Sequence, residues 1–261
     1  MNKSYWLLVL LILVFSSCSD EEKILRTISV EINTPDDIVE PEDSIVDPIL
    51  YKNTEILSSL PVEESKDKFI QVVLPAILIS KYFITRDQNK IKKLSDKKRW
   101  NNSDSTFYYQ QIEKFNAENI TDLIDRMNVH PTSIVMAQAA VESGWGSSRF
   151  FNEANNLFGI WSFDPKEPRI PAIGSNVFLR KYNNISQSIN DYFITIGRSF
   201  AYKKFREKRK NTDDIDELLP LLNRYSERGM AYVNQLNRII DQNELTRYDN
   251  YKINEEYIIS R

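Results

Sequence analysis

One glutamate in this 261-residue chain stands where acid–base chemistry is favoured. Glu142 follows an alanine-rich run over residues 137–140 and is followed at once by Ser143 and Gly144, so we expect it in the last turn of a helix. The unpaired carbonyl groups of that turn disfavour negative charge and should raise the pKa of the carboxyl. A carboxyl that stays protonated near neutral pH suits a general acid for glycosidic cleavage. Pairing with Arg149 is the alternative role of an isolated glutamate.

Composition excludes several other kinds of chemistry. The single cysteine, Cys18, excludes an internal disulfide framework and any cysteine-based metal cluster, and the single histidine, His130, excludes multi-histidine metal centres. Because 34 basic and 37 acidic residues leave a net charge of −3, the chain lacks the charge of a general nucleic-acid binder. We expect carboxylates and tyrosines to carry the chemistry, with no metal, no cofactor and no nucleic-acid partner.

The first 18 residues predict export. An uninterrupted apolar run from Trp6 to Phe15 is too short to span a bilayer permanently, and two serines separate it from Cys18. This ending resembles a lipobox, in which the cysteine is lipidated; two or more acyl chains on Cys18 would anchor the protein stably. A plain signal peptide or a short anchor with an incidental cysteine is the alternative. We expect a lipoprotein signal peptide over 1–17 and a cell-envelope protein anchored to a membrane, on the periplasmic side of an outer membrane or at the cell surface.

The rest of the chain divides by composition and periodicity. Residues 18–62 are rich in Asp, Glu and Pro without sustained helical period, which predicts a flexible tether. We expect an N-terminal helical segment over 63–115 that packs on a catalytic domain over 116–250, and a C-terminal tail over 251–261.

The expected fold is mainly α, with one short β-hairpin lobe beside a cleft. Prolines at 165, 168 and 171 and Gly174 forbid a helix there, and Asn176–Tyr182 has the pattern of a strand. Pro131 suits a first helical turn, so His130 lies near a helix start as a capping or packing residue rather than a catalyst. Apolar spacing predicts helices over Lys66–Leu94, Phe107–Phe115, Ile120–Met127, Ile134–Ser143, Ile185–Ile196, Ile215–Asn223 and Ala231–Ile240.

Two sequence blocks carry a resemblance to a known family. The run QAAVESGWGSSRF, followed after a short gap by NNLFGIW, strongly resembles the bacterial glucosaminidase family, which includes autolysins and flagellar peptidoglycan hydrolases of lysozyme-like fold. The Bax-like branch of that family fits best. Weaker resemblance extends over residues 63–245, through FLRKYNNISQSINDYF and RYSERGMAYVNQL.

The resemblance implies roles for individual residues. Glu142 is the expected catalytic acid. Ordinary core packing is the alternative role for the aromatic residues here, and we expect it for Phe150 and Phe163 more than for Trp161. The residues expected to build or support the sugar-binding cleft are Trp145, Asn155, Asn156, Phe158, Gly159 and Trp161.

The second catalytic group is left open by the sequence. Two-carboxylate hydrolysis needs another acid nearby, and the hairpin lobe offers only Asp164 and Glu167, of which Glu167 is the better candidate although a surface role is at least as well supported. The acetamido group of the substrate replaces a protein nucleophile in some glycosidases. Tyr225, which matches the family's closing tyrosine element with Tyr232 as its second member, would then assist.

We therefore expect a monomeric endo-β-N-acetylglucosaminidase whose partner is the glycan strand of peptidoglycan. A muramidase or lytic transglycosylase is an alternative, because a lone glutamate on a lysozyme-like helix also serves that chemistry. A non-catalytic peptidoglycan-binding lipoprotein that retains the cleft is the third.

Overall fold

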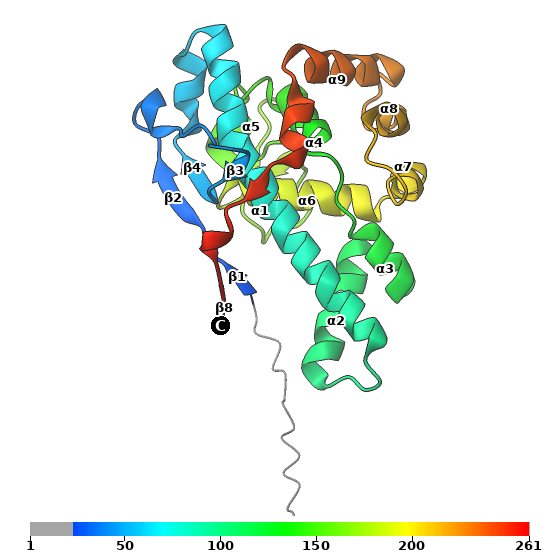
Figure 1. Cartoon of the computed structure of the whole chain (residues 1–261). Coiled ribbons are helices and arrows are strands. Elements are labelled where there is room, and N and C mark those ends of the chain that lie inside the picture. The colour runs from blue at the N-terminus through cyan, green and yellow to red at the C-terminus, as the bar shows by residue number, and fades with distance from the viewer. Residues whose placement is uncertain (1–22, 261) are drawn as a thin grey trace, which may run out of the picture.

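The computed structural model describes residues 23–260 (Figure 1). The predicted signal peptide over 1–17 and the predicted lipidation site Cys18 lie outside the described residues. Helices dominate, and the described strands pair into two-stranded sheets only. The expectation of a mainly α fold is confirmed.

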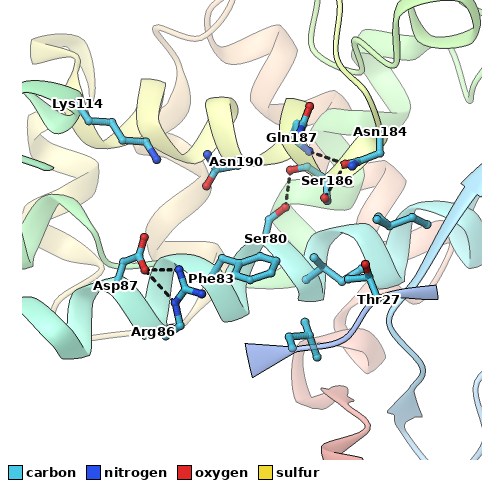
Figure 2. Close-up of a pocket in the computed structure, with 13 residues that line it drawn as sticks. Thr27, Ser80, Phe83, Arg86, Asp87, Lys114, Asn184, Ser186, Gln187 and Asn190 are labelled. Atoms are coloured by element: carbon cyan, nitrogen blue, oxygen red, sulfur yellow. Dashed lines mark hydrogen bonds and ion pairs between the residues drawn. The ribbon is translucent and has the colours of Figure 1, made fainter. Parts of the chain in front are cut away.

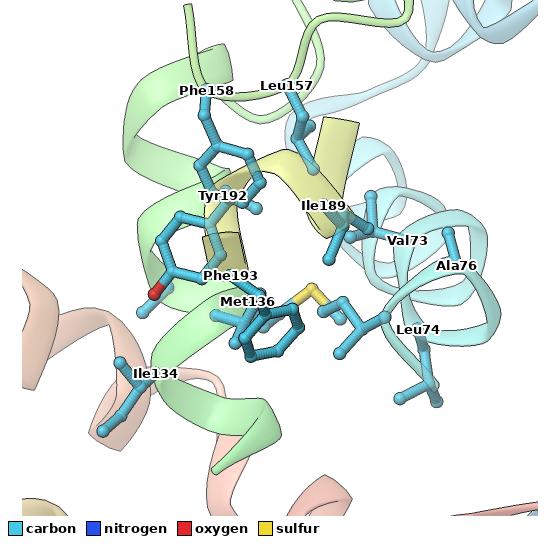
Figure 3. Packing of buried hydrophobic residues seen from close by; sticks show 14 of the residues in the cluster. Val73, Leu74, Ala76, Ile134, Met136, Leu157, Phe158, Ile189, Tyr192 and Phe193 are labelled. Atoms are coloured by element: carbon cyan, nitrogen blue, oxygen red, sulfur yellow. The ribbon is translucent and has the colours of Figure 1, made fainter. Parts of the chain in front are cut away.

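The long helix α1, Val62–Asp96, forms the centre of the fold (Figure 1). It packs most extensively on α6, Ile185–Arg198, and also on α4, Thr132–Ser143. Among the described residues α1 is the one helix long and apolar enough to cross a membrane by length and composition, and 67% of that apolar stretch is buried inside the fold. Figure 3 shows how the three helices share one core, with labelled side chains Val73, Leu74, Ala76, Ile134, Met136, Ile189, Tyr192 and Phe193.

Helix α4 is buried from Thr132 to Ala140, and residues far along the chain hold its first turn. Asp249 accepts hydrogen bonds from the Ser133 backbone N–H at 2.7 Å and from its hydroxyl at 2.8 Å. A carboxylate there satisfies donors that no helical carbonyl reaches and complements the positive end of the helix. Lys81 of α1 donates to the Thr132 hydroxyl at 2.9 Å. The start of α4 is therefore fixed by both α1 and the C-terminal region.

The remaining helices confirm most of those predicted from apolar spacing, and two further helices were not predicted. The missed helices are α5 and α7, each of six residues, too short to show an apolar repeat. In chain order, the helices besides α1, α4 and α6 are α2, Asn102–Phe115; α3, Ile120–Arg126; α5, Arg149–Ala154; α7, Lys203–Lys208; α8, Ile215–Leu218; and α9, Met230–Gln242. Short 3-10 helices lie at Pro35–Asp37, Thr54–Ser59, Phe200–Tyr202, Leu219–Leu222, Leu245–Asn250 and Glu255–Tyr257.

The expected hairpin is present. Strand β5, Arg169–Pro171, pairs antiparallel with β6, Phe178–Arg180, and Arg169 lies opposite Arg180. The prolines therefore do not prevent a hairpin; they limit the ladder to three residues on each side.

The prediction of a flexible tether over 18–62 is wrong from residue 23 onward. Strand β2, Ile28–Glu31, pairs in parallel with β4, Ile49–Lys52, and that sheet packs on α1 through β4. Scattered apolar side chains each find a place in the core, although their spacing shows no period: Ile32, Ile38, Val46, Tyr51 and Leu57 are all 3% exposed or less.

The C-terminal tail predicted over 251–261 is likewise part of the folded body through residue 260. Strand β3, Ile45–Val46, pairs with β7, Lys252–Ile253, and β1, Lys23–Leu25, pairs with β8, Ile258–Ser260 (Figure 1). Such pairings join segments more than 200 residues apart, so local sequence patterns carry no sign of them.

Candidate active site

The turn after α4 places Glu142 at the end of a buried helix, as predicted. Gly144 ends the helix at φ 57°, and Gly146 follows at φ 83°, where a Cβ would come within 3.0 Å of the Phe69 ring. Both glycines adopt a left-handed backbone that other residues enter at a cost. The Ser143 hydroxyl closes the turn by donating to the Ala139 carbonyl at 2.7 Å and accepting from the Gly146 N–H at 3.0 Å.

Trp145 supports this turn from the core side. Its ring meets the Phe69 ring of α1 edge to face with centroids 5.7 Å apart, and the Lys66 ammonium lies 5.8 Å from its centroid. Trp145 therefore fixes the position of the turn against α1.

Two tyrosines from a distant part of the sequence lie beside Glu142, because α9 packs on α4. Tyr232 of α9 donates its hydroxyl hydrogen bond to Glu142 Oε1 at 2.9 Å. Tyr225 stacks on Tyr232 with ring centroids 5.6 Å apart and planes 11° apart. The structure thus brings together the three residues that the sequence singled out from two separate motifs.

The electrostatics of Glu142 suit a proton donor. The residue as a whole stays exposed, as contact with a substrate requires, yet burial of its carboxyl raises the pKa above the ordinary value. The hydrogen bond from Tyr232 and the positive charge of Arg228 act in the opposite direction and lower the pKa. The rise expected from the sequence is present, and desolvation is its main cause.

The neighbouring tyrosines stay protonated. Burial first, and then the charge of Glu142, raise the pKa of Tyr232 far above its ordinary value. Burial also raises the pKa of Tyr225 well above the ordinary value, and Tyr232 and Glu142 add to that rise. Both hydroxyl groups are therefore neutral hydrogen-bond donors at physiological pH.

The NNLFG block is held in shape by its own side-chain hydrogen bonds. The Asn156 side chain donates to the carbonyls of Ile160 at 2.9 Å and Arg180 at 2.8 Å, and accepts from the Ile160 N–H at 2.9 Å. Asn155, at φ 51°, ends α5 and donates to the Tyr182 carbonyl at 2.9 Å. These amides therefore hold the loop to the hairpin.

Phe158 and Gly159 complete the same loop. The Phe158 ring stacks on Tyr192 of α6 with centroids 4.4 Å apart, and Figure 3 shows the two rings layered. Gly159 adopts φ 63°, which favours glycine at the bend.

Two aromatic side chains of the hairpin lobe face solvent. Trp161 is 54% exposed and Phe163 is 81% exposed, with ring centroids 6.1 Å apart. The expectation that Phe163 packs in the core is wrong. Trp161 still pairs with Leu179 in an isolated bridge and Ser162 is buried, but Phe163, the next residue, already points to solvent. The pair forms an exposed apolar face on the lobe.

Glu167, the candidate second carboxylate, already has a cationic partner. Its Oε2 lies 2.9 Å from Arg180 Nε in an ion pair, and Arg180 also pairs with Asp191 at 2.5 Å. Asp191 in turn accepts from the Tyr182 hydroxyl at 2.9 Å. Asp164 accepts from the Lys166 N–H at the exposed turn of the lobe. The structure thus gives Glu167 a role within the lobe, where it binds Arg180 of β6, and Arg180 in turn fastens the hairpin to α6 through Asp191.

Comparison with known proteins decides the family. The profile described as "Glucosaminidase: Mannosyl-glycoprotein endo-beta-N-acetylglucosaminidase" matches residues 117–245. These residues form a glucosaminidase-family domain. Protein bax of Escherichia coli (strain K12) is 25% identical over 193 residues, which cover 69% of this chain and 70% of that protein. The family and its Bax-like branch, expected from the sequence, are therefore confirmed.

A solved structure shows a weaker likeness. The catalytic domain of the autolysin Auto from Listeria monocytogenes is 20% identical, with a TM-score of 0.38 over 73% of this chain and 98% of that chain. The matched residues 117–245 include Glu142, Tyr225 and Tyr232. The family match over residues 117–245 shows that this domain is a glycoside hydrolase.

A separate pocket lies away from the glucosaminidase site, between α1 and the start of α6 (Figure 2). Its polar groups bond among themselves: Ser80 donates to the Ser186 carbonyl at 2.7 Å, and Arg86 pairs with Asp87 at 2.7 Å. Glu142 is not among its lining residues.

The raised pKa of Glu142 makes a prediction about stability. Because the folded state disfavours the carboxylate, wild-type stability should fall as pH rises through the pKa of Glu142. Glu142→Gln removes that penalty, so the variant should melt at a higher temperature than wild type at pH 8 and at the same temperature below about pH 3, where glutamates are protonated in both states. Melting curves across pH test this. An equal Glu142→Gln difference at every pH contradicts the prediction.

Proposed function

We propose that this domain is an endo-β-N-acetylglucosaminidase that cleaves the β-1,4 bond following N-acetylglucosamine in peptidoglycan, with Glu142 as the general acid. The observation that carries the proposal is the environment of Glu142. An exposed carboxyl with a raised pKa accepts a hydrogen bond from Tyr232 within a glucosaminidase-family domain.

The reaction follows from this placement. Glu142 would donate its proton to the glycosidic oxygen as that oxygen leaves, which avoids expelling an alkoxide. The acetamido oxygen of the substrate would attack the anomeric carbon as the glycosidic bond breaks, giving a cyclic intermediate. Water would then add to the anomeric carbon and return a proton to Glu142, so the carboxyl ends each cycle as it began.

Tyr225 is the proposed assistant in this reaction. Its neutral hydroxyl is available as a donor, and its ring is held against Tyr232 beside Glu142. A phenol in this position would orient the acetamido group for attack. The ion pair between Glu167 and Arg180 supports this choice over a second carboxylate, because Glu167 would have to leave its partner to act.

The exposed aromatic pair on the hairpin lobe is the proposed sugar platform. Trp161 and Phe163 present apolar faces to solvent, and aromatic faces suit the C–H surfaces of sugar rings. The loop held by Asn155 and Asn156 would position this platform relative to Glu142.

We also propose that the protein is a lipoprotein anchored through Cys18 to a membrane of the cell envelope. The apolar run and the serines before Cys18 support this location. Cleavage before Cys18 would leave the lipidated cysteine as the mature N-terminus.

Glu142→Gln tests the general acid. The variant should keep its fold by circular dichroism and lose at least about 100-fold in turnover on purified peptidoglycan, the low end of a general-acid contribution. Mass spectrometry of the wild-type products should show N-acetylglucosamine at the reducing end. Near wild-type turnover in the variant contradicts the assignment, and anhydromuramic acid ends would identify a lytic transglycosylase instead.

A pair of variants ranks the assisting groups. Tyr225→Phe should lower turnover severely, because it removes the hydroxyl that orients the nucleophile, whereas Glu167→Gln should lower it only a few-fold. Both rates are measured on one glycan substrate, with melting temperatures as the folding check. An inactive, folded Glu167→Gln beside an active Tyr225→Phe would reverse the assignment.

Cys18→Ser tests the anchor. The variant should leave the membrane fraction or accumulate as an unprocessed precursor, because serine has no thiol to receive the lipid. Fractionation and intact mass measure both outcomes. Unchanged processing and membrane association rule out the lipid anchor.

A further inference from the structure

A chain of hydrogen bonds runs from the interior of the domain to Glu142. Behind the bond from Tyr232 to Glu142, Gln138 Nε2 donates to the Tyr232 hydroxyl at 3.2 Å. The Tyr192 hydroxyl donates to Gln138 Oε1 at 2.6 Å, and His130 Nε2 lies 2.8 Å from the Tyr192 hydroxyl. Gln138 precedes Glu142 by four residues, so both lie on one face of α4.

The hydrogen-bond chain ends, at the side away from Glu142, on a buried arginine. Arg209 is 5% exposed, and its Nη1 lies 3.5 Å from His130 Nδ1. Its Nη2 donates to the carbonyls of Asp125 at 3.3 Å and Arg126 at 2.9 Å. A guanidinium carries donors only and cannot accept a hydrogen bond.

This arginine allows only one direction of hydrogen bonding through the chain. Because Arg209 presents N–H groups, His130 Nδ1 must be the acceptor, so the proton of a neutral ring sits on Nε2. Nε2–H then donates to the Tyr192 hydroxyl, which leaves Tyr192 to donate to Gln138. The opposite direction would set an Nδ1–H against the N–H groups of Arg209.

The ring of His130 is neutral in this setting. It is 2% exposed, and burial together with the positive charges of Arg209 and Lys81 lowers its pKa well below the ordinary value. A neutral ring has one donor and one acceptor, which is what a one-way chain requires.

We propose that Arg209, His130, Tyr192 and Gln138 are positioning residues that compel Tyr232 to donate to Glu142 Oε1, and thereby keep the acidic proton of Glu142 on Oε2. Oε1 is occupied as an acceptor in both protonation states of the carboxyl. Only Oε2 is then free to carry the proton that the proposed reaction delivers. This inference rests on the proposed role of Glu142 as the general acid.

The other groups around Glu142 do not provide this selection. Arg228 lowers the pKa of Glu142 by its charge, and Tyr192, Tyr202 and Tyr225 each feel the charge of Glu142. A charge acts on both oxygens of the carboxyl, whereas a hydrogen bond occupies one of them.

The first test is made on the wild-type full-length protein. Since His130 is the only histidine of the chain, its two ring nitrogens give unique ¹⁵N signals. We expect a neutral ring protonated at Nε2 throughout pH 5–8. Protonation at Nδ1, or a ring that becomes cationic in this range, overturns the proposal without any substitution.

The second test asks whether Tyr192 acts through Tyr232. In Tyr192→Phe the Gln138 amide loses its donor and can turn its oxygen toward Tyr232, which diverts the Tyr232 hydroxyl from Glu142. The pKa of Glu142, followed by ¹³C NMR of its carboxyl, should rise, as it should in Tyr232→Phe, because a bond that favours the carboxylate is lost. In the double variant the rise should equal that of Tyr232→Phe alone.

The control is Tyr182→Phe, which removes a buried hydroxyl that donates to Asp191 and takes no part in the hydrogen-bond chain to Glu142. It should destabilise the fold without moving the titration of Glu142. An unmoved titration in Tyr192→Phe, or additive shifts in the double variant, overturns the proposal.

The proposed function is tested separately. Both NMR measurements are made without substrate. They can therefore contradict the proposed hydrogen-bond network even if Glu142→Gln abolishes turnover. Conversely, an active Glu142→Gln variant would remove the general acid while leaving the NMR result intact.

Discussion

Nearly complete burial of helix α4 is the constraint on which the rest of the structure depends. A helix enclosed from Thr132 to Ala140 has no solvent to satisfy its polar groups. Its first turn is satisfied by Asp249 from the C-terminal region, and its one interior amide, Gln138, by two tyrosines. The helix reaches solvent only in its final turn, where Glu142 stands, so the packing that stabilises the fold also determines where a carboxyl can meet substrate.

The sequence predicts the local features of this arrangement well. The small residues of α4, the glycines that end it and Glu142 in the last turn all follow from propensity and capping rules, because those rules act over a few residues. The hairpin and the packing role of His130 follow in the same way, and His130 is indeed buried. Tyr225 and Tyr232 were found by resemblance, since no local rule brings residues 83 and 90 positions away to Glu142.

What the sequence did not predict are features set by distant partners. Ile32, Ile38 and Val46 lie in a stretch whose composition is typical of a tether, yet each is buried in the hydrophobic core, and Val46 pairs with Ile253 of the C-terminal strand β7. Gln138 appears in the sequence as one polar residue in an apolar helix, and only the structure shows the two hydroxyl groups that flank it. Arg180 similarly gives Glu167 a partner that no local pattern indicates, which changes the expected chemistry of the lobe.

The pairing of β1 with β8 has a consequence for where this enzyme can work. The first described strand starts at Lys23, five residues after Cys18, and five residues extend over at most about 17 Å. A tether extending to residue 62 would have let the domain range over more than about 100 Å. With the proposed anchor at Cys18, the domain would instead be held against the membrane surface, and glycan strands would have to pass within about one protein diameter of that surface to be cut.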